Sequence, residues 1–314
     1  MPAVITRGTF SAKAFGFAGG RPPLAVGAVG IFALGNTGVG STTRNKYTFA
    51  CDTNGTATAA SAASFSGSAT GNSTRGIFAL GCASCVAVTT RNKYTYAADA
   101  NCTAAAASAG SRYGAATGNN TRGIFALGIA CCSYSTTRNK YTYSCDTNGT
   151  AAAASAGNGI GSAAGNSTRG IFALGAVCGI GSATRNKYTY ACDTSGSAAA
   201  ASGASFRISA AGNSTRGIFA LGILSATGSS SVRNKYTYAC DTNGTATASS
   251  VASNGGSAAG NSTRGIFALG NTPCASTTRN KYTYACDTNG TAASASAASA
   301  LGSAASNGIA CVNV

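Results

Sequence analysis

The feature that most constrains this chain is an internal repeat. The hexapeptide Gly-Ile-Phe-Ala-Leu-Gly occurs six times, beginning at residues 30, 76, 123, 170, 217 and 265. Each copy is followed by a second block, Arg-Asn-Lys-Tyr-Thr-(Tyr/Phe), whose arginines lie 47, 47, 47, 48 and 46 residues apart. Such regularity is typical of one supersecondary unit that is copied and stacked, with each copy covering the apolar face of its neighbour.

The third repeat shows which secondary structure one unit favours. Residues 111–120 form a small-residue segment that ends in a Gly/Asn turn, and the next segment places Ile124 and Phe125 on opposite faces. Residues 139–145 alternate with aromatic side chains on one face, which indicates a strand. Asn148-Gly149 then predicts a hairpin turn into a strand over residues 150–155. One unit is therefore expected to hold four short antiparallel strands.

Four short strands in every 47 residues predict an all-β fold, a β-propeller of four-stranded blades. Residues 302–312 match the first two strands of a further unit, and residues 6–17 alternate well enough to supply two more. We therefore expect seven blades closed by both termini, since closure removes exposed sheet edges. Six blades and an open β-solenoid are the alternatives. The domain division is an N-terminal arm with closing strands at 1–23, followed by the propeller at 24–314.

The repeat unit resembles the kelch family. The small-residue strand together with RGIFALG is similar to the first two kelch strands, which end in a glycine pair. RNKYTYACDTNGTAT is similar to the third strand, its tyrosine-aspartate stretch and the turn into the fourth. Leu-Gly replaces the family's Gly-Gly, and the family's tryptophan is missing. The resemblance covers roughly residues 24–314 and implies the propeller fold. It implies no particular function, because that fold hosts enzymes, scaffolds and adhesins.

The composition argues against catalysis. The chain contains no histidine and no glutamate, so an imidazole base, a Ser-His-Asp triad and a histidine-ligated metal are all excluded. We predict a protein that is not an enzyme, with no catalytic residues, no cofactor and no metal site. All six acids are aspartates at one repeat position, where we expect each to cap a turn and screen a nearby lysine rather than to bind calcium.

No export signal or membrane span is visible in the sequence. Arg7 and Lys13 interrupt the apolar N-terminal residues, and nowhere do 18 apolar residues run together. We therefore expect no membrane span and assembly in the cytoplasm of the producing cell. Ten Asn-x-Ser/Thr sequons occur, but they recur because the turn recurs.

Thirteen cysteines are unusual for a cytosolic chain, because disulfides are rare there. Disulfides within or between blades of a particle that is later released would explain them, since each blade is small and poor in large apolar residues. Free thiols in small core positions and a zinc site of four thiolates are the alternatives. The disulfide candidates are the repeated cysteines Cys51, Cys145, Cys192, Cys240 and Cys286, the loop cysteines Cys82, Cys85, Cys131, Cys132, Cys178 and Cys274, and Cys102 and Cys311.

The formal net charge is +16, and the basic residues follow the repeat. Rings of like charge would attract acidic glycans, lipopolysaccharide or an acidic protein surface. The alternative is that the charges serve solubility and that the arginine stems pack between blades. A nucleic-acid partner is not expected, because the aromatic residues belong to the strand core. The candidate binding residues are Arg44, Lys46, Arg91, Lys93, Arg138, Lys140, Arg185, Lys187, Arg233, Lys235, Arg279 and Lys281.

A second resemblance concerns the setting. Residues 1–8 and 11–17 resemble the start of many structural proteins of tailed bacteriophages. With the repeats and the missing catalytic groups, this predicts a virion component, such as a tail, fibre or decoration protein, assembled in the host cytoplasm. Expected partners are other virion proteins, further copies of the chain and a host surface glycan. A bacterial cell-surface or secreted adhesin is the alternative, and an intracellular scaffold is third.

The contacts with these partners are expected from six segments that differ between repeats. One such segment follows each Leu-Gly, after residues 35, 81, 128, 175, 222 and 270.

Overall fold

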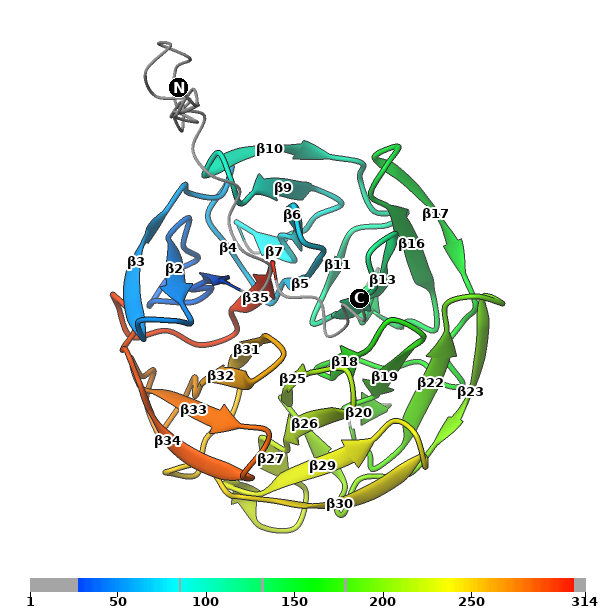
Figure 1. Ribbon diagram of the computed structural model, residues 1–314. Helices are drawn as coiled ribbons and strands as arrows, with labels where there is room; N and C mark the ends of the chain where they lie inside the picture. The colour runs from blue at the N-terminus through cyan, green and yellow to red at the C-terminus, as the bar shows by residue number, and fades with distance from the viewer. Residues whose placement is uncertain (1–27, 85, 131–132, 178–179, 308–314) are drawn as a thin grey trace, which may run out of the picture.

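The structure is a computed structural model, which describes residues 28–84, 86–130, 133–177 and 180–307. Six four-stranded antiparallel sheets are arranged in a ring around a central axis (Figure 1). All regular secondary structure in the described residues is β, which confirms the all-β expectation. The described part of the chain contains no helix long and apolar enough to cross a membrane.

Each sheet runs from a short inner strand at the axis to an outer strand at the rim. We number the sheets 1 to 6 in the order of their repeats. From inner to outer strand they are β35 (Ser303–Ser306), β1 (Val29–Ala33), β2 (Arg44–Thr48) and β3 (Thr53–Ala57) in sheet 1; β5 (Ser68–Gly71), β6 (Arg75–Ala79), β9 (Arg91–Thr95) and β10 (Ala100–Ala104) in sheet 2; and β12 (Ala115–Gly118), β13 (Arg122–Ala126), β16 (Arg138–Thr142) and β17 (Thr147–Ala151) in sheet 3.

The second half of the ring repeats the arrangement. Its strands are β18 (Ser162–Gly165), β19 (Arg169–Ala173), β22 (Arg185–Thr189) and β23 (Thr194–Ala198) in sheet 4; β25 (Ser209–Gly212), β26 (Arg216–Ala220), β29 (Arg233–Thr237) and β30 (Thr242–Ala246) in sheet 5; and β31 (Ser257–Gly260), β32 (Arg264–Ala268), β33 (Arg279–Thr283) and β34 (Thr288–Ala292) in sheet 6.

The C-terminal strand corrects the expectation of seven units. β35 pairs antiparallel with β1 and supplies the inner strand of sheet 1, so it does not begin a further sheet in the described residues. The physical reason is residue size: Ser303-Ala304-Ala305-Ser306-Asn307 matches the Ser-Ala-Ala-Gly-Asn pattern of other inner strands, whereas the residues before β1 do not. The closing strands predicted at residues 6–17 lie outside the described residues.

Each sheet buries both faces against its neighbours. Ile124 packs with Phe172 and Tyr188 of sheet 4, while Phe125 packs with Ile77 of sheet 2. Ile124 and Phe125 are both essentially inaccessible to solvent. The predicted two-sided burial of this strand is therefore confirmed, and the sheet-to-sheet contact is the core of the fold.

The inner strands converge on the axis and leave room only for small side chains. A Cβ atom added to Gly165 of β18 would lie 2.6 Å from Oγ1 of Thr117 on the neighbouring inner strand β12. This crowding explains why serine, alanine, threonine and glycine dominate these strands, and why their sequence does not look like an ordinary apolar strand.

The outer hairpin turns at a different place from the one that the sequence predicts. In sheet 3, Asn148 and Gly149 lie inside β17 and pair with Tyr141 and Lys140. The turn is made by residues 143–146 instead, and Asp146 takes the left-handed conformation with φ 52°. Aspartate tolerates this conformation better than most residues, and its carboxylate is held there by contacts described below. The repeated cysteines therefore lie in the turn and not on a strand face.

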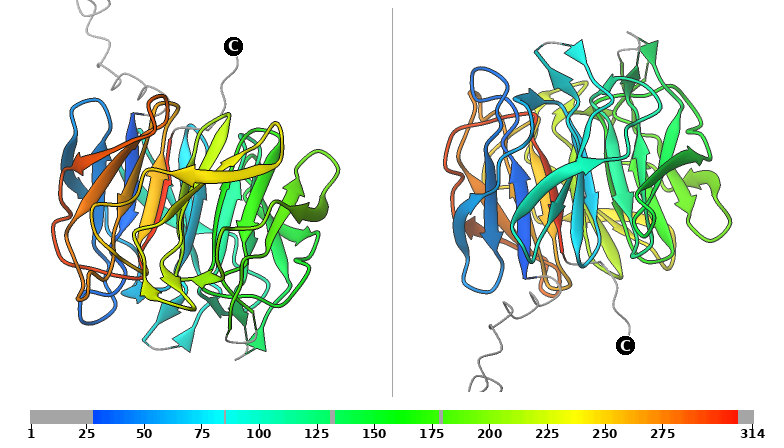
Figure 2. Two further views of the ribbon diagram at one scale, coloured as in Figure 1. Left: turned by 90° about the horizontal axis from the view of Figure 1, so that it is seen from below. Right: turned by 90° about the horizontal axis from the view of Figure 1, so that it is seen from above.

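The two ends of the ring differ. At one end lie the Asn-(Ser/Asn)-Thr turns before β6, β13, β19, β26 and β32 and the aspartate turns of the outer hairpins; we call it the constant end. The other end, the variable end, carries the segments after Leu-Gly and the segments that precede the inner strands, and short strands from both form small sheets (Figure 2). These strands are β4 (Ser64–Phe65), β7 (Cys82–Ala83), β8 (Val86–Ala87), β11 (Ser111–Arg112), β14 (Ile129–Ala130), β15 (Ser133–Tyr134), β20 (Ala176–Val177), β21 (Ile180–Gly181), β24 (Ser205–Phe206), β27 (Ile223–Leu224) and β28 (Gly228–Ser229).

Candidate functional site

The arginines of the predicted binding set lie between the sheets. All six are 0–1% exposed, although they carry a charge. The guanidinium carbon of Arg138 lies 4.4 Å from the ring centroid of Phe172 in the next sheet, a cation–π contact. Its Nη2 donates to Oδ1 of Asn186 at 3.1 Å, and its Nη1 donates to Oγ of Ser195 at 2.9 Å.

Burial lowers the pKa of Arg138 to about 10, so the guanidinium remains charged at neutral pH. The same arrangement recurs for Arg44, Arg91, Arg185, Arg233 and Arg279, which stack on Phe78, Phe125, Phe219, Phe267 and Phe32. No such buried guanidinium is open to a polyanion. The arrangement corresponds to the alternative in which arginine packs between sheets.

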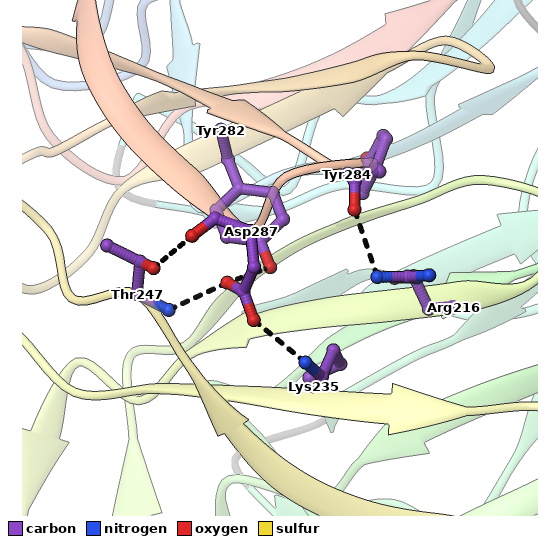
Figure 3. A network of polar contacts seen from close by, with 6 residues as sticks. All are labelled: Arg216, Lys235, Thr247, Tyr282, Tyr284 and Asp287. Atoms are coloured by element: carbon purple, nitrogen blue, oxygen red, sulfur yellow. Dashed lines mark hydrogen bonds and ion pairs between the residues drawn. The ribbon is translucent and has the colours of Figure 1, made fainter.

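The lysines of the same set pair with the six aspartates across the sheet boundary. In Figure 3, Asp287 accepts from Nζ of Lys235 at 2.8 Å and from the backbone N–H of Thr247 at 2.9 Å, both in the preceding sheet. The hydroxyl of Tyr282 in its own sheet donates at 2.5 Å to Oδ1, the oxygen that also accepts from Thr247, while Lys235 donates to Oδ2. The equivalent pairs are Lys46–Asp99, Lys93–Asp146, Lys140–Asp193, Lys187–Asp241 and Lys281–Asp52.

These contacts fix the charge state of the aspartates. Burial alone would raise the pKa of Asp193, but hydrogen bonds from Lys140, from the Tyr188 hydroxyl and from the Ala152 N–H outweigh it and hold the pKa at about 2. The carboxylate is therefore ionised and fully engaged at neutral pH. The expectation that each aspartate lies in a turn and screens a lysine is confirmed, but the backbone N–H that its carboxylate accepts belongs to the preceding sheet and not to its own turn. That the lysine comes from the preceding sheet could not be read from the sequence.

Five further arginines, from Thr-Arg-Gly, remain half-exposed at the constant end. Nη1 of Arg216 donates to the main-chain carbonyl of Tyr284 in the next sheet at 2.9 Å (Figure 3). Because every aspartate pairs with a lysine, none of these arginines has a salt bridge within the described residues. The group comprises Arg75, Arg122, Arg169, Arg216 and Arg264.

The described cysteines carry free thiols. Cys82 is buried in β7, whereas the others are exposed: Cys51, Cys102, Cys145, Cys192, Cys240, Cys274 and Cys286. The five turn cysteines belong to five different sheets, which keeps them from pairing with one another. The predicted disulfides are therefore absent among these residues, and no group that could hold a metal is found in the same part of the chain. The candidates Cys85, Cys131, Cys132, Cys178 and Cys311 lie outside the described residues.

The variable end presents apolar side chains to solvent. Val39, Val86 and Ile180 are 75%, 64% and 71% exposed, and each lies five residues before one of the buried arginines. Near the axis, the inner strands surround a channel of about 170 Å³ lined by glycine, alanine, serine and threonine with a single isoleucine. Six residues surround the mouth of this channel at the variable end, and no motif of the sequence indicates them.

The ring of radially arranged four-stranded sheets defines a β-propeller-like protein. A solved structure described as "Structure of YjhT" is similar to it, with a TM-score of 0.58 and 9% sequence identity, covering 77% of this chain and 87% of that chain. At this identity the likeness concerns the fold. No protein-family model and no curated protein matches the sequence.

Proposed function

We propose that this protein is a non-enzymatic structural component of a phage virion, a tail, fibre or decoration protein built as a closed, kelch-like, six-bladed propeller. It would make multivalent contacts with the particle or the host surface. The observation that carries the proposal is where the repeats differ. The constant end and the sheet contacts repeat almost unchanged, while the six segments of the variable end differ in length and residue type. A fixed scaffold with six different loops suits recognition.

The exposed apolar tips support contact with a protein surface. Val39, Val86 and Ile180 occupy one repeat position on three sheets, where a water-facing loop needs no large apolar side chain. Burying them against a partner would contribute about 1.5–3 kcal/mol each at most. Several such contacts from one rigid ring add up, because they are presented together.

The chemistry of the described residues supports a non-catalytic role. Every carboxylate is held by a lysine, a tyrosine and a backbone N–H, as at Asp287, so none is left to act as a base. The many serine and threonine hydroxyls have no histidine to activate them.

The setting is tested by following the protein in the cells that produce it. We expect it to sediment with particles through a density gradient and to remain with them after a high-salt wash. If it stays in the free-protein fraction at every stage, the virion assignment is wrong.

The loops are tested by grafting the segment of one repeat onto all six positions. We expect particle or host binding to fall sharply while the melting temperature stays near that of the parent protein. A matched control exchanges two constant-end turns, residues 71–76 and 118–123, which are identical except at one position and should change nothing. Unchanged binding in the loop-grafted protein would show that the loops carry no recognition.

A bacterial surface adhesin for anionic glycans is the second candidate. The half-exposed arginines of the constant end favour it, since their charge is not balanced by any described aspartate. Retention on a sulfated-polysaccharide column should fall steeply with salt and should drop in the fivefold Arg→Gln variant at residues 75, 122, 169, 216 and 264. Retention unchanged in that variant would remove this candidate.

A further inference from the structure

The mouth of the channel at the variable end is encircled by a ring of backbone hydrogen bonds. In each repeat, the residue just before the inner-strand segment donates its backbone N–H to the carbonyl oxygen of the equivalent residue in the preceding repeat, at 2.7–3.1 Å. The last bond runs from Ser66 back to Leu301, so the six residues form a continuous circle. We call them the mouth ring: Ser66, Tyr113, Ile160, Arg207, Gly255 and Leu301.

The mouth ring holds side chains where the backbone favours glycine. All six residues are in the left-handed region, and the five that are not glycine have φ between 55° and 60°. For a β-branched residue such as Ile160 this conformation is an outlier that costs stability. Only Gly255 avoids the cost. The ring also differs in residue type at every position, whereas the strands beside it are nearly uniform. The presence of five different non-glycine side chains in this conformation therefore calls for an explanation other than backbone geometry.

Two hydrogen-bond donors at this mouth have no acceptor. A cavity of about 50 Å³ is lined by the mouth ring and by the residue that follows each member. The Oγ of Ser66, in a residue that is 4% exposed, has no hydrogen-bond partner, and neither has Nε of Arg207. Arg207 uses Nη1 to donate to Oδ1 of Asn254 at 3.2 Å. Ser66 and Arg207 are three places apart in the circle of six, and both line the cavity.

The rest of the mouth is apolar and positively charged. Tyr113, Ile160 and Leu301 supply the apolar side chains, and the guanidinium of Arg112 lies 5.7 Å from the Tyr113 ring centroid. The six aspartates pair with lysines across the sheet boundaries, so none neutralises Arg207. A ligand that satisfies the two free donors must accept hydrogen bonds, and the unbalanced guanidinium favours a negative one.

We propose that the mouth ring binds a carboxylate joined to a short apolar body. Arg207 and Ser66 receive the carboxylate oxygens, while Tyr113, Ile160 and Leu301 contact the apolar body. The cavity has room for about three or four water-sized groups, which suits one carboxylate. The carboxylate belongs either to a free small acid or to the end of a longer peptide or glycan chain. This site does not depend on the proposed virion role, because it lies on the axis and not on the outer loops.

The chemistry is tested by titration calorimetry of the full chain with isovalerate and with isovaleramide, its neutral analogue. We expect isovalerate to saturate and to bind about tenfold more tightly than the amide. Arg207→Gln should weaken isovalerate about tenfold, and Ser66→Ala about threefold. Arg122→Gln at the constant end is the matched control, since it removes the same charge and should leave binding unchanged. Equal binding of acid and amide, or full affinity in Arg207→Gln, would overturn the proposal.

A second variant separates ligand binding from folding. Ile160→Gly removes the strained conformation, so we expect it to melt at the same or a higher temperature while isovalerate binds several-fold more weakly. A purely structural ring would gain stability and keep any affinity unchanged. The source of the carboxylate is distinguished by a tetrapeptide ending in valine and a uronic-acid oligosaccharide. Tighter binding of either than of isovalerate indicates a chain end, and binding of isovalerate alone indicates a free acid. Failure of all three probes to bind contradicts the site.

Discussion

The two ends of the ring are built from the same six repeats, yet they use them in opposite ways. At the constant end, polar side chains are committed to holding neighbouring sheets together: Asn72 caps its own turn and donates to the next one, and Asp287 joins three groups from two sheets. At the variable end, the segments differ in length and expose valine and isoleucine side chains to solvent.

The difference teaches where sequence change is tolerated. A residue that contacts the equivalent residue of the next repeat is constrained in all six repeats, because a substitution there disrupts the contacts with both neighbouring sheets. A loop that contacts mainly itself is free to differ. If this comparison holds, substitutions between the sheets should lower the free energy of unfolding far more than equivalent substitutions at the variable end.

The largest effect is expected from removing the strand that completes sheet 1. A chain that stops before Ser303 loses β35, the buried Ala305 and the contact of Asn307 Oδ1 with the Val29 N–H. The inner edge of β1 is then unpaired, so we expect the free energy of unfolding to fall by more than about 4 kcal/mol or the chain to fail to fold. A chain that stops after Asn307 keeps all of these contacts and serves as the control in denaturant unfolding. Equal midpoints for the two chains would contradict closure by β35.

A substitution of one buried arginine should rank second. Arg138→Lys loses the stacking on Phe172 and at least one of the two Nη hydrogen bonds, while it keeps a buried charge. We expect a loss of about 2–3 kcal/mol in the free energy of unfolding. Arg122→Lys makes the same chemical change at a half-exposed site and should cost less than about 1 kcal/mol. Similar losses for both variants would show that burial between sheets is not what matters.

Acid should weaken the contacts of the aspartates. The folded-state pKa of Asp193 is about 2, against an ordinary value of 3.8, so ionisation favours the folded state. Its contribution is fully present above about pH 5 and disappears as the pH falls from there through 2. Because six equivalent aspartates act together, we expect the melting temperature to fall steeply in this window.

Asp193→Asn is the matched variant for the acid experiment. It should lower stability by about 1 kcal/mol at neutral pH and should reduce the steepness of the acid transition. Melting curves between pH 2 and pH 7 measure both effects. An acid transition of unchanged slope in this variant would mean that other groups cause it.

The smallest effect is expected at the tip of a variable segment. Val86 is 64% exposed, so Val86→Ser removes little buried surface and should change the free energy of unfolding by less than about 0.5 kcal/mol. The same substitution should lower particle or host binding if the apolar tips make contacts. A clear loss of stability with unchanged binding would show that this segment of the variable end serves folding and not recognition.

Much of the fold follows from local pattern. The 47-residue period, the small inner strand and the opposite facing of Ile124 and Phe125 all predict stacked antiparallel sheets, and the structure has them. The aspartate turn was also foreseen, although its position was not. Asn148-Gly149 is the stronger local turn signal, yet both residues lie inside β17. The turn ends at Asp146 instead, because the carboxylate of Asp146 accepts hydrogen bonds from a lysine and from a backbone N–H of the preceding sheet.

By itself, the sequence determined that this chain is a repeat of short strands without imidazole chemistry, because period and composition are local properties. The tertiary structure alone decided what the charges do. Arg138 looks like a surface cation in the sequence, and only the approach of the next sheet buries it over Phe172. Likewise, Ser66 and Arg207 lie 141 positions apart, and only the closing of the ring brings them to one mouth. Contacts between repeats depend on how the sheets are arranged around the axis, and no single repeat carries that information.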